Sequence, residues 1–258
     1  MQSKPLLVFD FDGVIVDGMS EYWSSSRKAC LEIIFNESFS YSFPKSIPEK
    51  FRKIRPWITH GWEMVLITAE LSRKESPLFT LGAKAFSDDY EKNLTNALEA
   101  WKLTPKQLQK ALDQIRKETI QDNFEAWFAN HKPFPQVINR IKKLKDEGIN
   151  FAVLTTKSAG FTAKLLANLN LKPTLLYGHE SGSKTKVLLQ IAKHHKLQGF
   201  VEDRRSTLEK VLKTPGLESL PCYLADWGYL KPNDKLKIPS GIHLLETKNL
   251  MLPLANWH

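Results

Sequence analysis

Four short polar clusters either follow apolar runs or open helix-like segments, and their residue types could support phosphoryl transfer at a divalent cation. They are Asp10-Phe11-Asp12-Gly13, Thr155-Thr156-Lys157, Lys184 and Glu202-Asp203. Carboxylates are ligands that Mg²⁺ prefers, and a hydroxyl and an ammonium can hold phosphate oxygens. None of the clusters would be convincing alone, so the interpretation depends on their order and on the elements that position them.

The first cluster lies at the carboxyl end of the predicted strand Leu6–Phe9, where open α/β sheets bind their ligands. Residues two apart in extended backbone face the same way, so Asp10 and Asp12 can converge on one centre. Gly13 lets a ligand approach the main chain closely. The alternative is an Asp-x-Asp-Gly turn that only ends the strand, since Asp and Gly are common turn residues.

The second and third clusters stand at predicted helix starts. Thr155, Thr156 and Lys157 follow an apolar run, and hydroxyls and amides there could hold phosphate oxygens. The alternative is a threonine that caps the next helix. The positive charge of Lys184 opposes the helix dipole, so another interaction should favour its placement. Lys186 is the competing candidate, and we expect it to be exposed to solvent.

The fourth cluster, Glu202-Asp203, closes the apolar run Gly199–Val201. Adjacent carboxylates repel each other, so they need a cation or a basic neighbour. A metal ion would satisfy this need, and so would Arg204 and Arg205.

Apolar runs alternate with helix-like segments from residue 135 to the end of the chain. The predicted strands are 6–9, 151–154, 174–177, 199–201, 221–225 and 241–245. The predicted helices between them are 135–147, 161–169, 184–195 and 206–213. Uninterrupted apolar runs are typical of strands buried on both faces of a parallel sheet. The alternation predicts an α/β fold with a doubly wound, mainly parallel sheet, which is a Rossmann-like core.

The stretch between the first strand and this core is predicted to be an all-helical insertion. Its clearest helices are 21–35, 57–71, 88–101 and 105–122, with interruptions at 36–47 and at Ser76-Pro77. Thr104-Pro105 is a strong start signal, a capping hydroxyl followed by proline at the first helical position. The predicted domains are therefore a core of 1–18 and 133–258 and a helical domain of 19–132.

The composition is that of an ordinary globular protein, with 258 residues, 42% hydrophobic and 25% charged. The apolar runs are far shorter than the ~20 residues that cross a bilayer. The first residues lack a secretory pattern, and two cysteines, Cys30 and Cys222, do not make a disulfide framework or zinc site, so we expect a cytoplasmic protein. The net charge of +9 is scattered over lysines that could attract anionic substrates, without the basic stripe that nucleic acid requires.

With these motifs in order, the chain resembles the haloacid dehalogenase superfamily. The residues that carry the resemblance to its four motifs are Asp10–Val14, Leu154–Lys157, Lys184 and Glu202-Asp203, the last as an acidic pair. Trp227-Gly228-Tyr229 is similar to an aromatic-Gly segment of phosphoglycolate-phosphatase-like members. The resemblance covers residues 5–18 and about 133–230, and it implies that the helical domain is the family's cap.

The resemblance implies a phosphoaspartate mechanism in which Asp10 is the nucleophile and Asp12 the general acid and base. Asp10, the Asp12 carbonyl oxygen and Asp203 would hold Mg²⁺, with Glu202 as a possible further ligand. Thr155 and Lys184 would act in catalysis. The phosphate would be bound by Gly13, Thr155, Thr156 and Lys184. Lys184 should also lower the pKa of Asp10, and Asp12 should point away from metal and lysine.

The presence of Asp12 favours a phosphatase over a dehalogenase, because a halide leaves without needing a proton. The commoner fourth motif has Gly-Asp followed by another Asp, whereas here Glu202 replaces Gly, and Thr207 and Leu208 stand where the later Asp would be. This weaker metal site keeps a feebly active or non-catalytic binding protein as an alternative. A phosphomutase acting through the same phosphoaspartate is another, and we expect a small phosphorylated metabolite as substrate.

Substrate choice should lie in the cap. The candidates near one helix start are Arg55, His60, Trp62 and Glu63, although packing and surface charge explain such residues as readily. Three further aromatic residues, Trp101, Trp127 and Phe128, are predicted to form the core of the cap.

Overall fold

The computed structural model describes residues 5–34 and 42–257, and the chain divides into two compact units. The α/β unit comprises the chain up to Asp17 and from Lys132 onward, and the helical unit comprises Gly18–His131. Residues 36–41 of the interruption expected at 36–47 lie outside the described residues, and its remainder forms neither helix nor strand. Within the described ranges, no helix is both long and apolar enough to cross a membrane.

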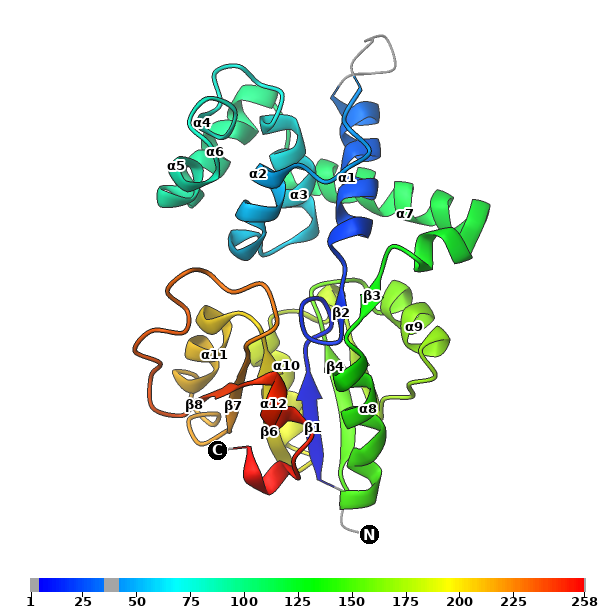
Figure 1. The fold of residues 1–258 in the computed structure, drawn as a ribbon, viewed down its shortest axis with the longest axis vertical. Coiled ribbons are helices and arrows are strands. Elements are labelled where there is room, and N and C mark those ends of the chain that lie inside the picture. Colours follow the sequence, from blue (N-terminus) through cyan, green and yellow to red (C-terminus); the bar gives the residue numbers. More distant parts are fainter. Residues whose placement is uncertain (1–4, 35–41, 258) are drawn as a thin grey trace. The chain divides into compact units, whose positions relative to one another are not determined.

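The α/β unit is built on a six-stranded parallel sheet with the order β5-β4-β1-β6-β7-β8 (Figure 1). The strands are β1 (Leu6–Phe9), β4 (Asn150–Leu154), β5 (Leu175–Tyr177), β6 (Leu197–Glu202), β7 (Cys222–Ala225) and β8 (Ile242–Leu245). All four side chains of β1 are buried, as expected for a central strand that is covered on both faces. The predicted α/β fold is confirmed, and strand ends differ from those expected by at most two residues.

Helices cover both faces of the sheet (Figure 1). On one face, α10 (Lys184–Ala192) and α11 (Arg205–Leu212) pack through apolar side chains against the sheet. The other face is covered by α8 (Pro135–Lys143), which continues as η2 (Leu144–Glu147), and by α9 (Ala159–Asn168). Shorter elements complete this unit: η3 (His179–Ser181), α12 (Thr247–Leu250) and η4 (Leu254–Asn256). From β1 the chain continues to β4 and β5 on one side of β1, and then returns to β6 on its other side. The strand order therefore reverses between β1 and β6, and the ends of these two strands flank the switch point.

Several helix ends differ from the predictions for local reasons. The helix expected at 135–147 changes to 3₁₀ geometry at Leu144 and ends at Gly148, whose φ of 71° is left-handed. α9 begins at Ala159, because Ser158 accepts the backbone N–H of Phe161 and caps it. α10 ends at Ala192, three residues before the expected end.

Two very short strands join the units: β2 (Val16–Asp17) and β3 (Lys132–Pro133). They pair antiparallel, with Val16 opposite Pro133 and Asp17 opposite Lys132. Two-residue strands show neither an apolar run nor alternation, so the sequence did not predict them.

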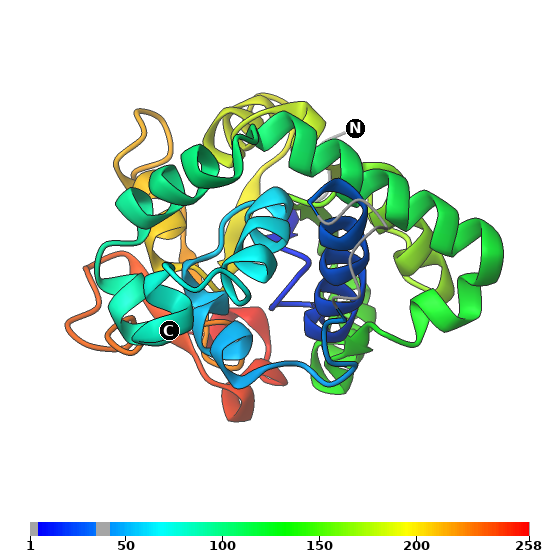
Figure 2. The same ribbon diagram turned by 90° about the horizontal axis from the view of Figure 1, so that it is seen from above.

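The helical unit contains α1 (Met19–Ile33), α2 (Glu49–Ile54), η1 (Arg55–Trp57), α3 (Gly61–Glu70), α4 (Pro77–Thr80), α5 (Ala83–Asp88), α6 (Tyr90–Trp101) and α7 (Pro105–Phe128). α1, α3 and α7 pack against one another (Figure 2). Thr104 and Gln107 form a capping box at the start of α7, and Asn123 breaks its helical geometry just after the predicted end at Asp122. The helix expected at 57–71 is divided, because His60 and Glu63 cap a new helix at Gly61. The short α4 and α5 were not predicted.

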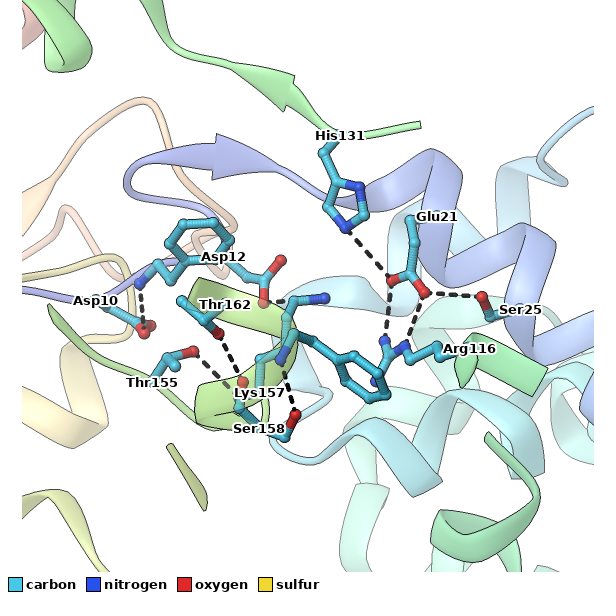
Figure 3. A network of polar contacts seen from close by, with 12 residues as sticks. Asp10, Asp12, Glu21, Ser25, Arg116, His131, Thr155, Lys157, Ser158 and Thr162 are labelled. Carbon is cyan, nitrogen blue, oxygen red and sulfur yellow. Dashed lines mark hydrogen bonds and ion pairs between the residues drawn. The ribbon is translucent and has the colours of Figure 1, made fainter. Parts of the chain in front are cut away.

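A buried ion pair lies within the helical unit (Figure 3). Arg116 donates two hydrogen bonds to the Glu21 carboxylate, at 2.7 and 2.9 Å, and Ser25 donates a third at 2.7 Å. The ring of His131 is 3.9 Å from the same carboxylate. The charges of Glu21 and Arg116 cancel here, and both carboxylate oxygens accept hydrogen bonds.

Candidate active site

Asp10 follows the last residue of β1, at the switch point of the sheet. Its backbone N–H donates to the carbonyl oxygen of Val201 in β6, at 2.8 Å, which extends the ladder by one residue. Asp10 is 7% exposed, and its carboxylate accepts the Phe11 N–H at 2.7 Å. The Lys184 ammonium lies 2.9 Å from the other Asp10 oxygen. The motif therefore places a buried carboxylate at a strand end, which a simple turn would not require.

Lys184 joins two of the acidic motifs. Its ammonium contacts Asp10 and also lies 2.7 Å from Glu202 Oε2. Lys184 is only 12% exposed, whereas Lys186 is exposed as expected. These two ion pairs are the interaction that favours a lysine at the start of α10, where the helix dipole alone would oppose it.

Glu202 has partners at both carboxylate oxygens. Oε2 faces Lys184, and Oε1 accepts the backbone N–H groups of Asp203 and Arg204, each at 3.1 Å. Of the two arginines that we considered as its partner, Arg205 instead binds Glu209 at 2.7 Å. Glu202 therefore orients the ammonium that faces Asp10.

The electrostatic balance differs from the expectation that Lys184 keeps the Asp10 pKa low. Burial and the nearby Glu202 together raise the pKa of Asp10 to about 7, although Lys184 lowers it as expected. Burial also raises the pKa of Glu202, against the effect of Lys184. Burial lowers the pKa of Lys184, but the two carboxylates outweigh this and leave it raised. The ammonium is therefore charged, and the acids around it outnumber it.

Three carboxylates form a cluster at this end of the sheet. One oxygen each from Asp10, Glu202 and Asp203 lie within 4.8 Å of one another, and all three residues are buried. A set of oxygen donors with excess negative charge fits a hard divalent cation such as Mg²⁺. The side chain of Asp12 is outside this cluster, which agrees with an expected role for its carbonyl oxygen only.

Asp12 faces a different lysine. The Lys157 ammonium is fully buried and lies 3.6 Å from Asp12 Oδ2 (Figure 3). Lys184, by contrast, contacts Asp10 and Glu202. Asp12 therefore lies beside Lys157, whereas Lys184 is paired with other carboxylates.

The Thr155–Lys157 turn is held by a local hydrogen bond. The Thr155 hydroxyl is buried and accepts the Lys157 N–H at 3.1 Å, while Thr156 is exposed. Since Ser158 caps α9, neither threonine serves as the cap that we considered. Thr155 follows β4 as Asp10 follows β1, and its N–H bonds to the Tyr177 carbonyl oxygen of β5.

Gly13 is required by its conformation and by Asp203. Its φ is +87°, which favours glycine, and a methyl group on it would overlap the Asp203 carboxylate. We expected a ligand to approach the Gly13 backbone closely, and it is the Asp203 side chain that does so.

The candidate specificity residues of the helical unit have structural roles. The buried Glu63 carboxylate accepts the N–H groups of Thr59 and His60, each at 3.0 Å, and the Tyr90 hydroxyl at 2.6 Å. Arg55 is buried over the Tyr22 ring, and Trp62 is half-buried. Glu63 and Arg55 thus have contacts within the helical unit, and a role of the four candidates in substrate choice stays a prediction.

Of the three aromatic residues predicted for the core of the helical unit, Trp127 is buried. Trp101 and Phe128 are only half-buried, and Trp101 donates its ring N–H to Glu70 at 2.8 Å. Its partner lets a polar ring nitrogen sit partly inside the unit.

Sequence reasoning assigned no role to Lys157, and it missed the Glu202–Lys184 pair. Lys157 belongs to a motif that we identified, so its position was visible. Its partner Asp12 is distant in the sequence, and no local pattern could have paired them.

Comparison with known proteins gives the same picture. The fold is similar to a predicted phosphatase from Clostridium acetobutylicum, with a TM-score of 0.58, 15% identity and 96% of each chain covered. It is also similar to a haloacid dehalogenase-like family hydrolase from Streptococcus pneumoniae (TM-score 0.57, 16% identity, 97% of this chain and 98% of that chain). A predicted phosphoglycolate phosphatase from Haemophilus somnus gives a TM-score of 0.57 at 15% identity, with 97% of this chain and 98% of that chain covered.

No curated protein matches the sequence. A family model described as haloacid dehalogenase-like hydrolase, however, matches residues 5–205. That range contains Asp10, Thr155, Lys184 and Asp203, the residues that the fold brings to one end of the sheet. This chain therefore belongs to the haloacid dehalogenase-like hydrolases.

Proposed function

We propose that the protein is a Mg²⁺-dependent phosphatase that hydrolyses a small phosphorylated metabolite through an aspartyl phosphate on Asp10. The observation that carries the proposal is the Asp10 carboxylate at the switch point, 2.9 Å from the Lys184 ammonium and within 4.8 Å of oxygens from Glu202 and Asp203. The proposed nucleophile and cation ligands follow the neighbouring strands β1 and β6, and the fixed positive charge is at the start of α10.

In the first step, an Asp10 oxygen forms a bond to phosphorus and the bond from phosphorus to the leaving oxygen breaks. Asp12 gives that oxygen a proton. In the second step, Asp12 takes a proton from water, the water oxygen attacks phosphorus, and the bond to Asp10 breaks to release phosphate. Lys157, 3.6 Å from the Asp12 carboxylate, keeps it on the side away from Lys184.

The phosphoryl oxygens are proposed to lie between Lys184, the Thr155 hydroxyl and the amide of Thr156, beside Gly13, whose own N–H already donates to the Val16 carbonyl oxygen. Lys184 is already fixed by its two ion pairs, so it stabilises developing negative charge without reorganising. Asp10, Asp203 and the Asp12 carbonyl oxygen are the proposed Mg²⁺ ligands. When bound, Mg²⁺ would offset the charge of the phosphate and favour the ionised form of Asp10.

We assign Glu202 to the support of Lys184, since both of its oxygens already have partners. The helical unit is proposed to act as the family's cap and to select the substrate. Cys30 and Cys222 are buried free thiols, and burial raises the pKa of Cys222 to about 12. Two such unreactive thiols support our proposal of a reducing, cytoplasmic setting.

The test is a panel of phosphorylated metabolites and p-nitrophenyl phosphate, assayed for phosphate release with and without Mg²⁺. We expect turnover that is lost on chelation and in Asp10→Asn. Transfer of the phosphoryl group to a second hydroxyl would indicate a mutase, and chloride release from haloacids would indicate a dehalogenase. The absence of turnover on the whole panel would reject the phosphatase and favour a binding protein.

A further inference from the structure

The segment Trp227-Gly228-Tyr229, just after β7, contacts both the metal-site motif and the strand that leads to the helical unit. The Tyr229 N–H donates to Asp203 Oδ2 at 2.8 Å, and the Tyr229 hydroxyl donates to Asp17 Oδ1 at 2.5 Å. The Trp227 ring N–H donates to the Val14 carbonyl oxygen at 3.1 Å. One short segment therefore spans from Asp203 to β2.

Asp203 is enclosed on two sides by glycine backbone. A methyl group on Gly13 would overlap the carboxylate of Asp203, and one on Gly228 would overlap its Cβ atom. The Asp203 carboxylate also accepts a hydrogen bond from the Tyr229 N–H. The direction of the Asp203 carboxylate therefore depends on where the Tyr229 backbone is held.

The Tyr229 phenol anchors that backbone to β2. A hydroxyl that donates to a carboxylate at 2.5 Å is a short, charge-assisted hydrogen bond, roughly twice as strong as a neutral one. Its acceptor, Asp17, is paired in β2 with Lys132 of β3, and Gly13 bonds to Val16 in the same connection. The phenol thus anchors the segment to a part of the chain that is itself held at two points.

We propose that Tyr229 is a positioning residue for the metal site, and that its bond to Asp17 holds Asp203 where it can share a cation with Asp10. The proposal rests on the proposed Mg²⁺-dependent function only in identifying Asp203 as a cation ligand. It adds that cation affinity is linked to β2, which is the last part of the α/β unit before the helical unit begins. By linkage, a substitution that frees β2 weakens cation binding.

The experiment measures Mn²⁺ affinity of the full chain directly, from the electron paramagnetic resonance signal of free Mn²⁺, without substrate. We expect Tyr229→Phe, which removes only the hydroxyl, to weaken Mn²⁺ binding about tenfold, the size expected when a hydrogen bond to a charged group is lost. Asp17→Asn should have a similar effect. The double variant should be no weaker than either single variant, because both remove the same bond.

The matched control is Tyr223→Phe, which removes a phenol hydroxyl from β7 of the same unit. Tyr223 packs against Trp257 and His243, away from Asp203, so its Mn²⁺ affinity should equal that of the wild type. A second readout separates positioning from general destabilisation. The Mg²⁺ concentration that gives half-maximal turnover should rise in Tyr229→Phe, while kcat at saturating Mg²⁺ recovers to nearly the wild-type value.

The outcomes distinguish this proposal from the proposed function. Weakened Mn²⁺ binding in both single variants, without phosphatase turnover in the wild type, supports the positioning role and rejects the phosphatase. Unchanged Mn²⁺ affinity in folded Tyr229→Phe and Asp17→Asn overturns the positioning role and leaves the phosphatase intact. Additive losses in the double variant, or no Mn²⁺ binding by the wild type, also overturn it.

Discussion

Two buried clusters of charged side chains, one in each unit, differ in how positive and negative groups balance. In the helical unit, Glu21 is matched by Arg116 through two hydrogen bonds, and Ser25 donates a third. In the α/β unit, the carboxylates of Asp10, Glu202 and Asp203 form a cluster, and the Lys184 ammonium contacts two of them, Asp10 and Glu202.

The difference separates a structural cluster from a functional one. The Glu21–Arg116 pair has equal and opposite charges and satisfied hydrogen bonds, so it connects two helices and leaves no net charge that would attract a cation. Burial, together with the neighbouring Glu202 carboxylate, raises the pKa of Asp10 to about 7, and a bound cation would offset the cost of ionising it. Burial of acidic groups is common to both places, so burial alone does not identify a site.

The largest expected effect is the loss of turnover in Asp10→Asn. The amide cannot form the acyl phosphate, so phosphate release should fall by at least about 10³-fold. Steady-state assays with saturating Mg²⁺ measure this, and circular dichroism confirms the fold. Activity within tenfold of the wild type would remove Asp10 from the mechanism.

The balanced cluster should respond in stability. Arg116→Leu leaves the Glu21 carboxylate buried without its guanidinium, and we expect a loss of about 3–5 kcal/mol in unfolding free energy. Urea denaturation measures it. Glu21→Leu combined with Arg116→Leu should recover much of the loss, because no buried charge then remains; a double variant as unstable as Arg116→Leu would contradict the comparison.

In the cluster of Asp10, Glu202 and Asp203, removal of a buried charge should instead increase the unfolding free energy. The folded protein without metal keeps a proton on Asp10 up to about pH 7, whereas the unfolded chain releases it near the ordinary value of 3.8. Unfolding therefore releases a proton between these values, and this contribution to stability is lost as pH rises. Asp10→Asn does not titrate, so in chelator it should gain about 4 kcal/mol over the wild type between pH 4 and pH 8.

Denaturation series at several pH values, with chelator and with Mg²⁺, test this expectation. Mg²⁺ should stabilise the wild type and reduce the advantage of Asp10→Asn, since the cation binds the folded state. A pH-independent difference between the two proteins would show that Asp10 is not a strained carboxylate.

The smallest expected effect concerns Glu202. Glu202→Gln should lower kcat/KM about tenfold, because Lys184 loses one of its two carboxylate partners, a change of about 1.4 kcal/mol. Mg²⁺ affinity should change little, since both Glu202 oxygens are already engaged. Lys186→Ala is the matched control, an exposed lysine on the same helix. A large loss of Mg²⁺ affinity in Glu202→Gln would identify Glu202 as a ligand instead.

The fold was predictable because burial leaves a local signature. Four consecutive apolar residues, as in β1, are typical of a strand that is covered on both faces, and Thr104-Pro105 marks a helix start. The proximity of Asp10 and Asp203 was also predictable in part. Each directly follows a strand, and the carboxyl ends of parallel strands meet at one edge of the sheet. The two-residue strands β2 and β3 carry no such signal.

The partners of the site residues were harder to predict. Lys184 could be recognised as a candidate, but its contact with Glu202 depends on where α10 starts against β6. The net rise in the Asp10 pKa depends on burial and on Glu202, which exceed the effect of the neighbouring lysine. Such balances are set by three-dimensional packing and cannot be summed from residue types.

Mass spectrometry of acid-quenched Asp12→Ala protein, mixed with a turned-over substrate and Mg²⁺, tests the central claim most directly. Without Asp12 to activate water, the acyl phosphate should accumulate. We predict that a phosphoryl group is found on the peptide that contains Asp10, and that Asp10→Asn abolishes it. Turnover by the wild type with no phosphorylated peptide in Asp12→Ala, or with the phosphoryl group on another residue, would contradict the account.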